Sequence, residues 1–299
     1  MTQSITQTDT SPRAARQRPK SGQGLIWPLL LLPALLVLAA SFVLPLGAMA
    51  VNSLHPGGGM GRIDPGWTLD NYRRFVTDPF FLGVLLRTLG IGLLVSLIAI
   101  VIAYPLAWRL ARSRSRFRGA LTFVVLAPLL ISVVVRNLGW LPVLGETGFI
   151  NWALIGAGVI STPLSLINNT TGVVIGLVHA FVPFMIVSLL AAIRGIDPAL
   201  EDAAASLGAK SWGIFFRVIL PLSRKGLITG TLLVFSLSIS AFITPAMMGG
   251  RRVLMMPGLI EQQMRSVLNY PFGATIAVIL LLVTAVAVIL TLRIGRETA

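Results

Sequence analysis

The chain has 299 residues, of which 55% are hydrophobic and only 11% charged, and its mean hydropathy is +0.87. Soluble domains carry roughly 25% charged residues, so this composition excludes an ordinary soluble globule and indicates a membrane protein. The net charge of +14 comes from basic residues in separate short segments rather than in one patch, which disfavours nucleic acid as a partner. The absence of cysteine excludes a disulfide framework and a cysteine-ligated metal.

Taken in chain order, residues 1–24 are rich in Ser, Thr, Gln, Pro and Arg, so we expect a disordered basic tail there. A membrane-spanning helix needs about 20 apolar residues. Six stretches reach or approach that length: Leu25–Val51, Thr88–Trp108, Gly119–Val135, Gly172–Ile193, Gly226–Gly250 and Phe272–Leu292. The sequence therefore predicts an all-α membrane protein with six transmembrane helices and a membrane domain over residues 25–299.

A seventh stretch, Gly148–Asn168, is milder, because it holds Asn151 and several Ser, Thr and Pro residues. We interpret it as an interfacial or re-entrant segment. Cytoplasmic loops carry an excess of Lys and Arg. With six spans, sixteen of the 24 Lys and Arg residues fall before the first span, after the second, after the fourth and after the last. Both termini and the segment over residues 194–225 are therefore expected on the cytoplasmic side.

No set of catalytic residues stands out along the chain. His55 and His179 lie far apart in sequence, and the glycine-rich stretch after His55 lacks the Lys and Ser or Thr of a phosphate-binding loop. None of the six stretches holds Asp or Glu, which argues against a carrier coupled to protons or sodium through carboxylates. His179 is interpreted as the partner of an interhelical hydrogen bond, with a place in a transport path as the alternative. We expect neither an enzyme nor a cofactor on this chain.

Small and helix-breaking residues recur inside the predicted spans. Glycines four residues apart, Gly172 with Gly176 and Gly226 with Gly230, share one helix face and favour close approach of another helix. Prolines inside spans either free backbone groups that line a cavity or produce packing kinks. They are Pro105, Pro128, Pro183 and Pro245.

The stretch "EDAAASLGAKSWGIFFRVILP", residues 201–221, is too short and too charged to span a bilayer. Asp197 followed by a proline predicts the start of a helix that runs to about Leu207. Gly208 then supplies a left-handed stop, and Ser211 is expected to cap a second helix that Pro221 ends. The second helix, with Trp and Phe side chains, suits a lipid surface.

The first of these helices has a different character. Its narrow face consists of small or aliphatic side chains flanked by Glu201 and Asp202, and acids are unfavourable near anionic lipid headgroups. This pattern favours docking into a groove on another protein. The face is made of Leu200, Ala203, Ala204 and Leu207.

The same residues resemble a known motif. Asp202-Ala203-Ala204, three residues, Gly208, nine residues and Val218-Ile219-Leu220-Pro221 resemble the EAA loop of ABC importer permeases, with Asp202 in place of Glu and Val218 in place of Ile. The resemblance covers roughly Thr88–Leu292. Stretches at residues 104–112, 135–151 and 242–250 resemble the spermidine/putrescine-type branch of these permeases.

The resemblance implies a type I ABC importer permease, a multi-pass protein of the bacterial inner membrane. It implies a second permease subunit in a heterodimer, two ATPase subunits that hold ATP and magnesium, and a periplasmic solute-binding protein. It also implies that a coupling helix docks on an ATPase subunit. The residues expected to dock are Glu201, Asp202, Ala203, Ala204, Leu207, Gly208, Val218, Leu220 and Pro221.

The transported solute is expected to be small and polar, with a polyamine-like solute favoured. Importers of iron(III), aminophosphonates or other small solutes are the alternatives. A stand-alone secondary transporter is more distant, because it would need coupling carboxylates or an inverted repeat. Candidate path residues, for which ordinary packing is the competing interpretation, are Phe181, Phe235, Ser236, Ser238, Ser240 and Thr244. The four-residue spacing of Ser236, Ser240 and Thr244 predicts that their hydroxyls share one helix face.

Overall fold

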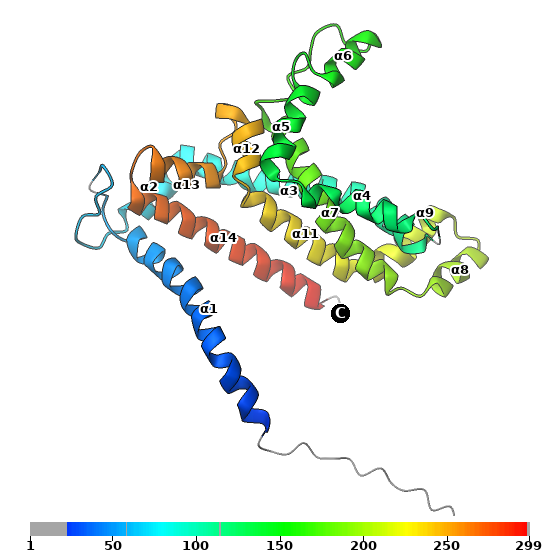
Figure 1. Ribbon diagram of the computed structural model, residues 1–299, viewed down its shortest axis with the longest axis horizontal. Helices are drawn as coiled ribbons and strands as arrows, with labels where there is room; N and C mark the ends of the chain where they lie inside the picture. Colours follow the sequence, from blue (N-terminus) through cyan, green and yellow to red (C-terminus); the bar gives the residue numbers. More distant parts are fainter. Residues whose placement is uncertain (1–22, 58, 114, 298–299) are drawn as a thin grey trace, which may run out of the picture. The chain divides into compact units, whose positions relative to one another are not determined.

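The computed structural model describes residues 23–297 apart from 58 and 114. The predicted disordered tail lies outside the described residues except for Gln23 and Gly24, which already belong to the first helix. The chain forms two compact units, Met1–Ala48 and Met49–Ala299. Every regular element of the described part is helical, as predicted (Figure 1).

The helices of the first part of the chain are α1 (Gln23–Ser53), α2 (Asp70–Thr77), α3 (Pro79–Arg112), α4 (Arg118–Leu130), α5 (Val133–Leu144), α6 (Phe149–Gly156) and α7 (Thr170–Arg194). Those of the second part are α8 (Pro198–Ser206), α9 (Ser211–Ile214), the π-helix η1 (Phe215–Ile219), α10 (Leu220–Leu222), α11 (Arg224–Ile239), α12 (Ile243–Met248), the 3₁₀ turn η2 (Gly250–Arg252), α13 (Met256–Arg265) and α14 (Tyr270–Glu297).

Four of these helices are long and apolar enough to cross a membrane, and the number rises to six if each of two bent helix pairs counts as one span. The four lie in α1, α3, α7 and α14 and confirm the first, second, fourth and sixth predicted spans. The bent pairs are α4 with Val133–Gly156, at 101°, and Ser211–Leu222 with α11, at 73°.

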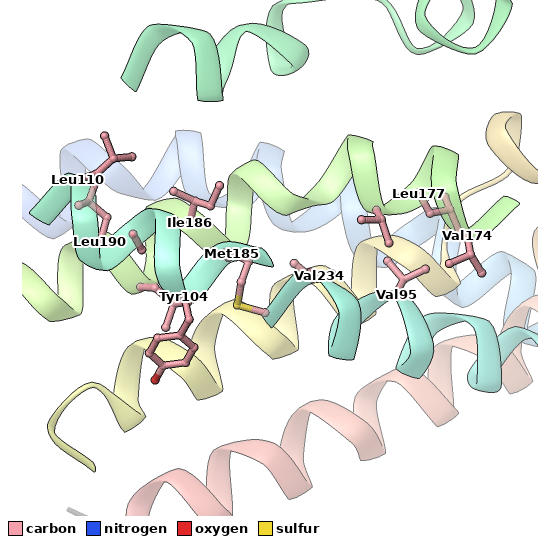
Figure 2. Packing of buried hydrophobic residues seen from close by; sticks show 14 of the residues in the cluster. Val95, Tyr104, Leu110, Val174, Leu177, Met185, Ile186, Leu190 and Val234 are labelled. Carbon is pink, nitrogen blue, oxygen red and sulfur yellow. The ribbon is translucent and has the colours of Figure 1, made fainter. Parts of the chain in front are cut away.

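Helices α3, α7 and α11 form the main core of the second unit. Figure 2 shows buried side chains that meet between them, including Val95 and Tyr104 of α3, Leu177 and Met185 of α7, and Val234 of α11. All five are at most 4% exposed. Because α7 and α11 both belong to this core, the segment that joins them is attached to one packed body at both of its ends.

The glycine spacings predicted from the sequence are confirmed as packing contacts. A Cβ atom placed on Gly226 of α11 would lie 2.4 Å from the Cβ of Ala192 on α7, and one on Gly230 would lie 2.6 Å from the sulfur of Met185. The hydroxyl of Ser188 on α7 donates a hydrogen bond of 2.8 Å to the carbonyl of Gly226. Helices α7 and α11 therefore touch backbone to backbone, as small residues allow.

A smaller aromatic cluster lies at the end of the second unit where α2 and α13 are found (Figure 1). Phe81 and Phe272 meet edge to face with ring centroids 4.8 Å apart. The Arg74 guanidinium of α2 lies 4.7 Å from the centroid of the Phe272 ring. Apolar contact and cation–π attraction together fix α2 against α3 and α14.

Two predicted spans are wrong as continuous helices. The stretch Gly119–Val135 breaks after Leu130, where Ile131 is extended, and the side chain of Arg136 donates a 2.9 Å hydrogen bond to the Pro128 carbonyl at the end of α4. This bond satisfies one of the carbonyl groups that a helix end leaves free. Figure 1 shows α5 and α6 running away from the packed helices.

The stretch Gly226–Gly250 breaks as well, because α11 ends at Ile239 and α12 begins at Ile243. Pro245 falls in the first turn of α12. The N–H groups of a first helical turn have no intrahelical acceptor, so a proline there costs no hydrogen bond. Inside a continuous helix the same proline would remove one.

The seventh stretch is not a span, as predicted. Helix α6 covers only Phe149–Gly156, and the chain then stays irregular until α7 begins. The buried side chain of Asn151 holds this segment together, since it donates to the carbonyls of Gly145 and Leu164 and accepts from the Leu164 N–H, all at 2.8–2.9 Å.

Candidate functional site

The segment between α7 and α11 lies at the opposite end of the second unit from α2 and α13 (Figure 1). Its first helix, α8, begins as predicted. The Asp197 carboxylate accepts a 2.9 Å hydrogen bond from the Ala199 N–H, and Pro198 takes the first helical position. Helix α8 ends at Ser206, and Gly208 adopts φ +81°, the left-handed conformation expected of the stop.

The second half of the segment differs from the prediction. Ser211 is the first residue of α9 rather than its cap, and the preceding Lys210 makes no side-chain cap hydrogen bond. The helical path also continues through Pro221 and bends only at Ser223. The turn before the proline is a π-helix, in which the Leu220 N–H donates to the Phe215 carbonyl. A widened turn of this kind is a known way for a helix to bend without ending.

The predicted docking residues fall into two groups. Asp202, Ala203, Leu207 and Gly208 are exposed, with Leu207 at 89%, and Ala204 is half-buried beneath them. The structure therefore brings an acid, a small residue and an apolar residue onto the outward side of α8. The second group sits in the π-helical half and consists of half-buried packing residues, namely Val218, Leu220 and Pro221.

Glu201 does not point outward with Asp202. Its carboxylate accepts hydrogen bonds from Arg112 Nε at 2.7 Å and from Trp108 Nε1 at 3.1 Å, and Arg112 and Trp108 belong to α3. The side chain of Glu201 is 15% exposed and that of Arg112 23%. Arg112 and Trp108 were not among the residues predicted for this site, although the four-residue spacing of Tyr104, Trp108 and Arg112 places all three on one face of α3.

A polar cleft of about 380 Å³ lies beside this ion pair. It brings carboxylates and guanidinium groups close to the exposed side of α8, so it offers charged contacts to a partner. Its lining consists of Ala111, Arg112, Ser113, Arg118, Pro198, Glu201 and Asp202. Among the described residues, no three His, Asp or Glu residues gather in a way that could hold a metal ion.

The candidate path residues do not form one surface. Because α11 ends at Ile239, Ser236, Ser240 and Thr244 do not share a face of a continuous helix, and that prediction is wrong. The hydroxyl of Ser240 donates to the carbonyl of Ser236 at 2.7 Å, and that of buried Ser238 donates to the Val234 carbonyl at 2.7 Å.

The remaining path candidates are largely engaged in packing. Thr244 is buried, and its hydroxyl accepts a 3.1 Å hydrogen bond from the Asn137 amide of α5. Phe181 and Phe235 are half-buried, and Phe181 packs against the main core. His179 accepts a 3.2 Å hydrogen bond at Nδ1 from Trp140 Nε1, which joins α5 to α7 and confirms the interhelical interpretation of this histidine.

Comparisons with known proteins agree with this arrangement. Residues 99–298 match the family described as "Binding-protein-dependent transport system inner membrane component". The chain is 34% identical over 230 residues to the spermidine/putrescine transport system permease protein PotB of Escherichia coli (strain K12), which covers 77% of this chain and 83% of that protein. It is 32% identical over 163 residues to the molybdenum transport system permease protein ModB of Azotobacter vinelandii, covering 54% of this chain and 70% of that protein.

The fold is also similar to that of solved transporters. A chain of a bacterial alginate ABC transporter, crystallised with its alginate pentasaccharide-bound periplasmic protein, superposes with a TM-score of 0.76. The superposition covers 92% of this chain and 96% of that chain at 16% sequence identity, so the likeness concerns the fold alone.

Proposed function

Because the chain belongs to the family of binding-protein-dependent transport system inner membrane components, we propose that α8 is the helix through which a separate ATPase subunit drives it. The chain is a multi-pass permease of an ABC importer in the inner membrane, a non-catalytic component of a family that uses ATP through separate ATPase subunits. Its proposed partners are a second permease subunit, two ATPase subunits and a periplasmic solute-binding protein.

The observation that carries this proposal is the outward side of α8. The helix lies outside the membrane-spanning helices, and the side chain of Asp197 caps its start. Asp202 is exposed, and within the described residues its carboxylate accepts no hydrogen bond, so it is available for a charge-assisted contact. The small side chain of Ala203 permits close approach of a partner, and exposed Leu207 supplies apolar area.

The mechanism that follows is alternating access. ATP binding draws two ATPase subunits together, and each moves the coupling helix docked on it. The segment returns to the membrane through the packed residues Val218, Leu220 and Pro221, so the movement reaches α7 and α11, which flank the segment. Helices α7 and α11 then tilt, which opens the cavity of the permease to the outside. The binding protein releases its solute into this cavity.

The proposed solute is polyamine-like, and the support comes from relatives named as spermidine/putrescine permeases. Helices α3, α7, α11 and α12 hold no Asp or Glu. In this proposal other subunits neutralise most of the charge of the cation, and the half-buried Phe181 and Phe235 rings are only candidate cation–π contacts. The second candidate is an importer of iron(III), aminophosphonates or another small solute, and the similarity to a molybdenum permease supports only the last of these, another small solute.

The solute is tested on the cognate periplasmic protein. This protein, purified without unfolding, should retain a polyamine that mass spectrometry identifies. A retained metal complex or phosphonate would reject the polyamine and leave the docking of α8 untouched.

Docking is tested by co-purification. The ATPase should co-purify with the wild-type permease and be lost with Asp202→Lys, which reverses the exposed charge, and with Gly208→Val, since a β-branched residue at φ +81° is strained. Gly213→Ala is the matched control, because its Cβ meets Ala209 only at an ordinary 3.6 Å. Docking through α8 is wrong if Gly208→Val and Asp202→Lys reach the membrane at wild-type levels and still retain the ATPase.

A further inference from the structure

A row of side chains on α3 holds the segment between α7 and α11. Tyr104, Trp108 and Arg112 are each four residues apart and share one helix face. The Tyr104 hydroxyl lies 2.9 Å from the hydroxyl of Ser223, the residue at which the segment bends into α11. The Tyr104 and Trp108 rings both pack on Phe215, with centroids 5.1 and 5.8 Å away. This face of α3 therefore contacts the second half of the segment at two points.

Arg112 and Trp108 also hold the first half. Arg112 places its Nε 2.7 Å and its Nη2 2.6 Å from one carboxylate oxygen of Glu201, and Trp108 donates to the other oxygen. The same guanidinium donates a 3.0 Å hydrogen bond to the Ile196 carbonyl, directly before the cap of α8. Both oxygens of Glu201 are engaged in a partly buried setting, where charge-assisted hydrogen bonds are strong.

Helix α8 packs against α9 and η1 but makes few side-chain hydrogen bonds to the rest of the described chain. Within the described part of the chain, Glu201 makes the only side-chain hydrogen bonds that join α8 to a spanning helix. The Ser206 hydroxyl donates to the Asp202 carbonyl, but this hydrogen bond stays inside α8 and does not connect it to another helix. Glu201 and its two donors therefore form the hydrogen-bonded link between α8 and α3, beside the packing of α8 on α9 and η1.

We propose that Arg112 and Trp108 are positioning residues, which fix α8 to α3 through Glu201 so that a displacement of α8 is transmitted directly into α3. This inference rests on the proposed docking of α8 on an ATPase subunit and adds a third helix to the two that flank the segment. Glu201 then acts inside the permease, and Asp202 beside it faces the partner. Helix α3 moves together with α7 and α11, because the three share one core.

The first test compares transport with ATP hydrolysis in the assembled importer. Glu201→Gln removes the charge and keeps the shape, and Trp108→Phe keeps a ring against Phe215 but loses the indole donor. Both variants should retain the ATPase and hydrolyse ATP, while the amount of solute moved per ATP falls, on the order of tenfold for Glu201→Gln because hydrogen bonds to charged groups are among the strong ones. Glu261→Gln is the matched control, since it removes the charge of an exposed ion pair with Arg265 at 4.0 Å.

A charge exchange separates positioning from general support of the fold. Arg112→Glu and Glu201→Arg each place like charges together and should lower solute moved per ATP strongly. The double variant restores an attractive pair and should recover more activity than either single change. Failure of the double variant to exceed the single ones, in complexes that contain the ATPase at wild-type amounts, overturns the inference.

The second test measures the position of α8 directly. The chain has no cysteine, so spin labels can be attached to Ser206→Cys on α8 and Arg109→Cys on α3, both exposed positions. The distance distribution should be narrow with Glu201 present and broader with Glu201→Gln. Unchanged widths together with unchanged solute per ATP reject the positioning role, whereas loss of the ATPase from the wild-type complex would reject the docking proposal instead.

Discussion

Replacing Gly226 by alanine should separate α7 from α11 and destabilise the protein. The new Cβ would lie 2.4 Å from the Ala192 Cβ and 2.9 Å from the Ser188 carbonyl oxygen. Carbon atoms pack at about 3.5–4.0 Å, so the helices must move apart by at least about 1 Å. Overpacking of this kind costs about 1–3 kcal/mol. The carbonyl belongs to the backbone of α7 and has no rotamer with which to escape.

Gly90→Ala on α3 is the matched control, because a Cβ there meets nothing within 4 Å. Alanine gains roughly 1 kcal/mol of helix propensity over glycine in a helix interior; Gly90 lies in the interior of α3, whereas Gly226 lies in the first turn of α11, so the gain at Gly226 does not exceed that at Gly90. The free energies of unfolding of the two variants should then differ by about 1–3 kcal/mol, which is the cost of overpacking at Gly226. For a domain of this size each kcal/mol corresponds to about 2–4 °C in Tm.

The assay is thermal unfolding of the purified protein in detergent. Gly226→Ala should unfold several degrees below Gly90→Ala, and Gly230→Ala should lie between them, since its nearest neighbour is the flexible end of Met185. Adding Ala192→Gly to Gly226→Ala removes the closest clash and should recover part of the loss. Equal Tm values for Gly226→Ala and Gly90→Ala would refute the packing argument.

Three further changes test single contacts. Asp197→Ala removes the cap of α8 and should weaken ATPase retention about fivefold, since a cap contributes about 1 kcal/mol; pull-down at graded ATPase concentrations measures this, and unchanged retention contradicts it. Asn137→Leu leaves the buried Thr244 hydroxyl without its donor and should lower Tm by about 2–4 °C for a loss near 1 kcal/mol; a Tm equal to that of the wild type speaks against that bond. Trp140→Phe removes the donor to His179 and should lower Tm by less than about 3 °C without changing transport, because interhelical hydrogen bonds in membranes average roughly 0.6 kcal/mol; lost transport would instead place His179 in the path.

Local signals in the sequence predicted much of the site. Asp197, the proline after it and Gly208 mark the ends of α8 through the chemistry of the helix terminus itself, and the structure has the start as predicted and the end one residue before Leu207. Apolar runs likewise predicted the spans in α1, α3, α7 and α14. Each of these features depends on residues that are close together in the chain.

The features that were not predicted depend on tertiary packing. Glu201 and Arg112 are 89 residues apart in the sequence, and nothing local distinguishes an acid that faces α3 from one that faces solvent. For the same reason Glu201 and Asp202 were assigned one role, although they point to different partners. The break between α11 and α12 was missed because an apolar run with a proline reads as one span until the position of Pro245 in a first turn is known.

The short length of α4 has a consequence for how the chain crosses the bilayer. Its 13 residues rise about 20 Å at 1.5 Å per residue, whereas the hydrocarbon is about 30 Å thick. Helix α4 alone is therefore too short to cross the hydrocarbon, and a span at this point needs the bent pair of α4 and Val133–Gly156. Any backbone group of the bend that lies within the hydrocarbon needs a hydrogen-bond partner from protein, and Arg136 supplies one such partner to the Pro128 carbonyl.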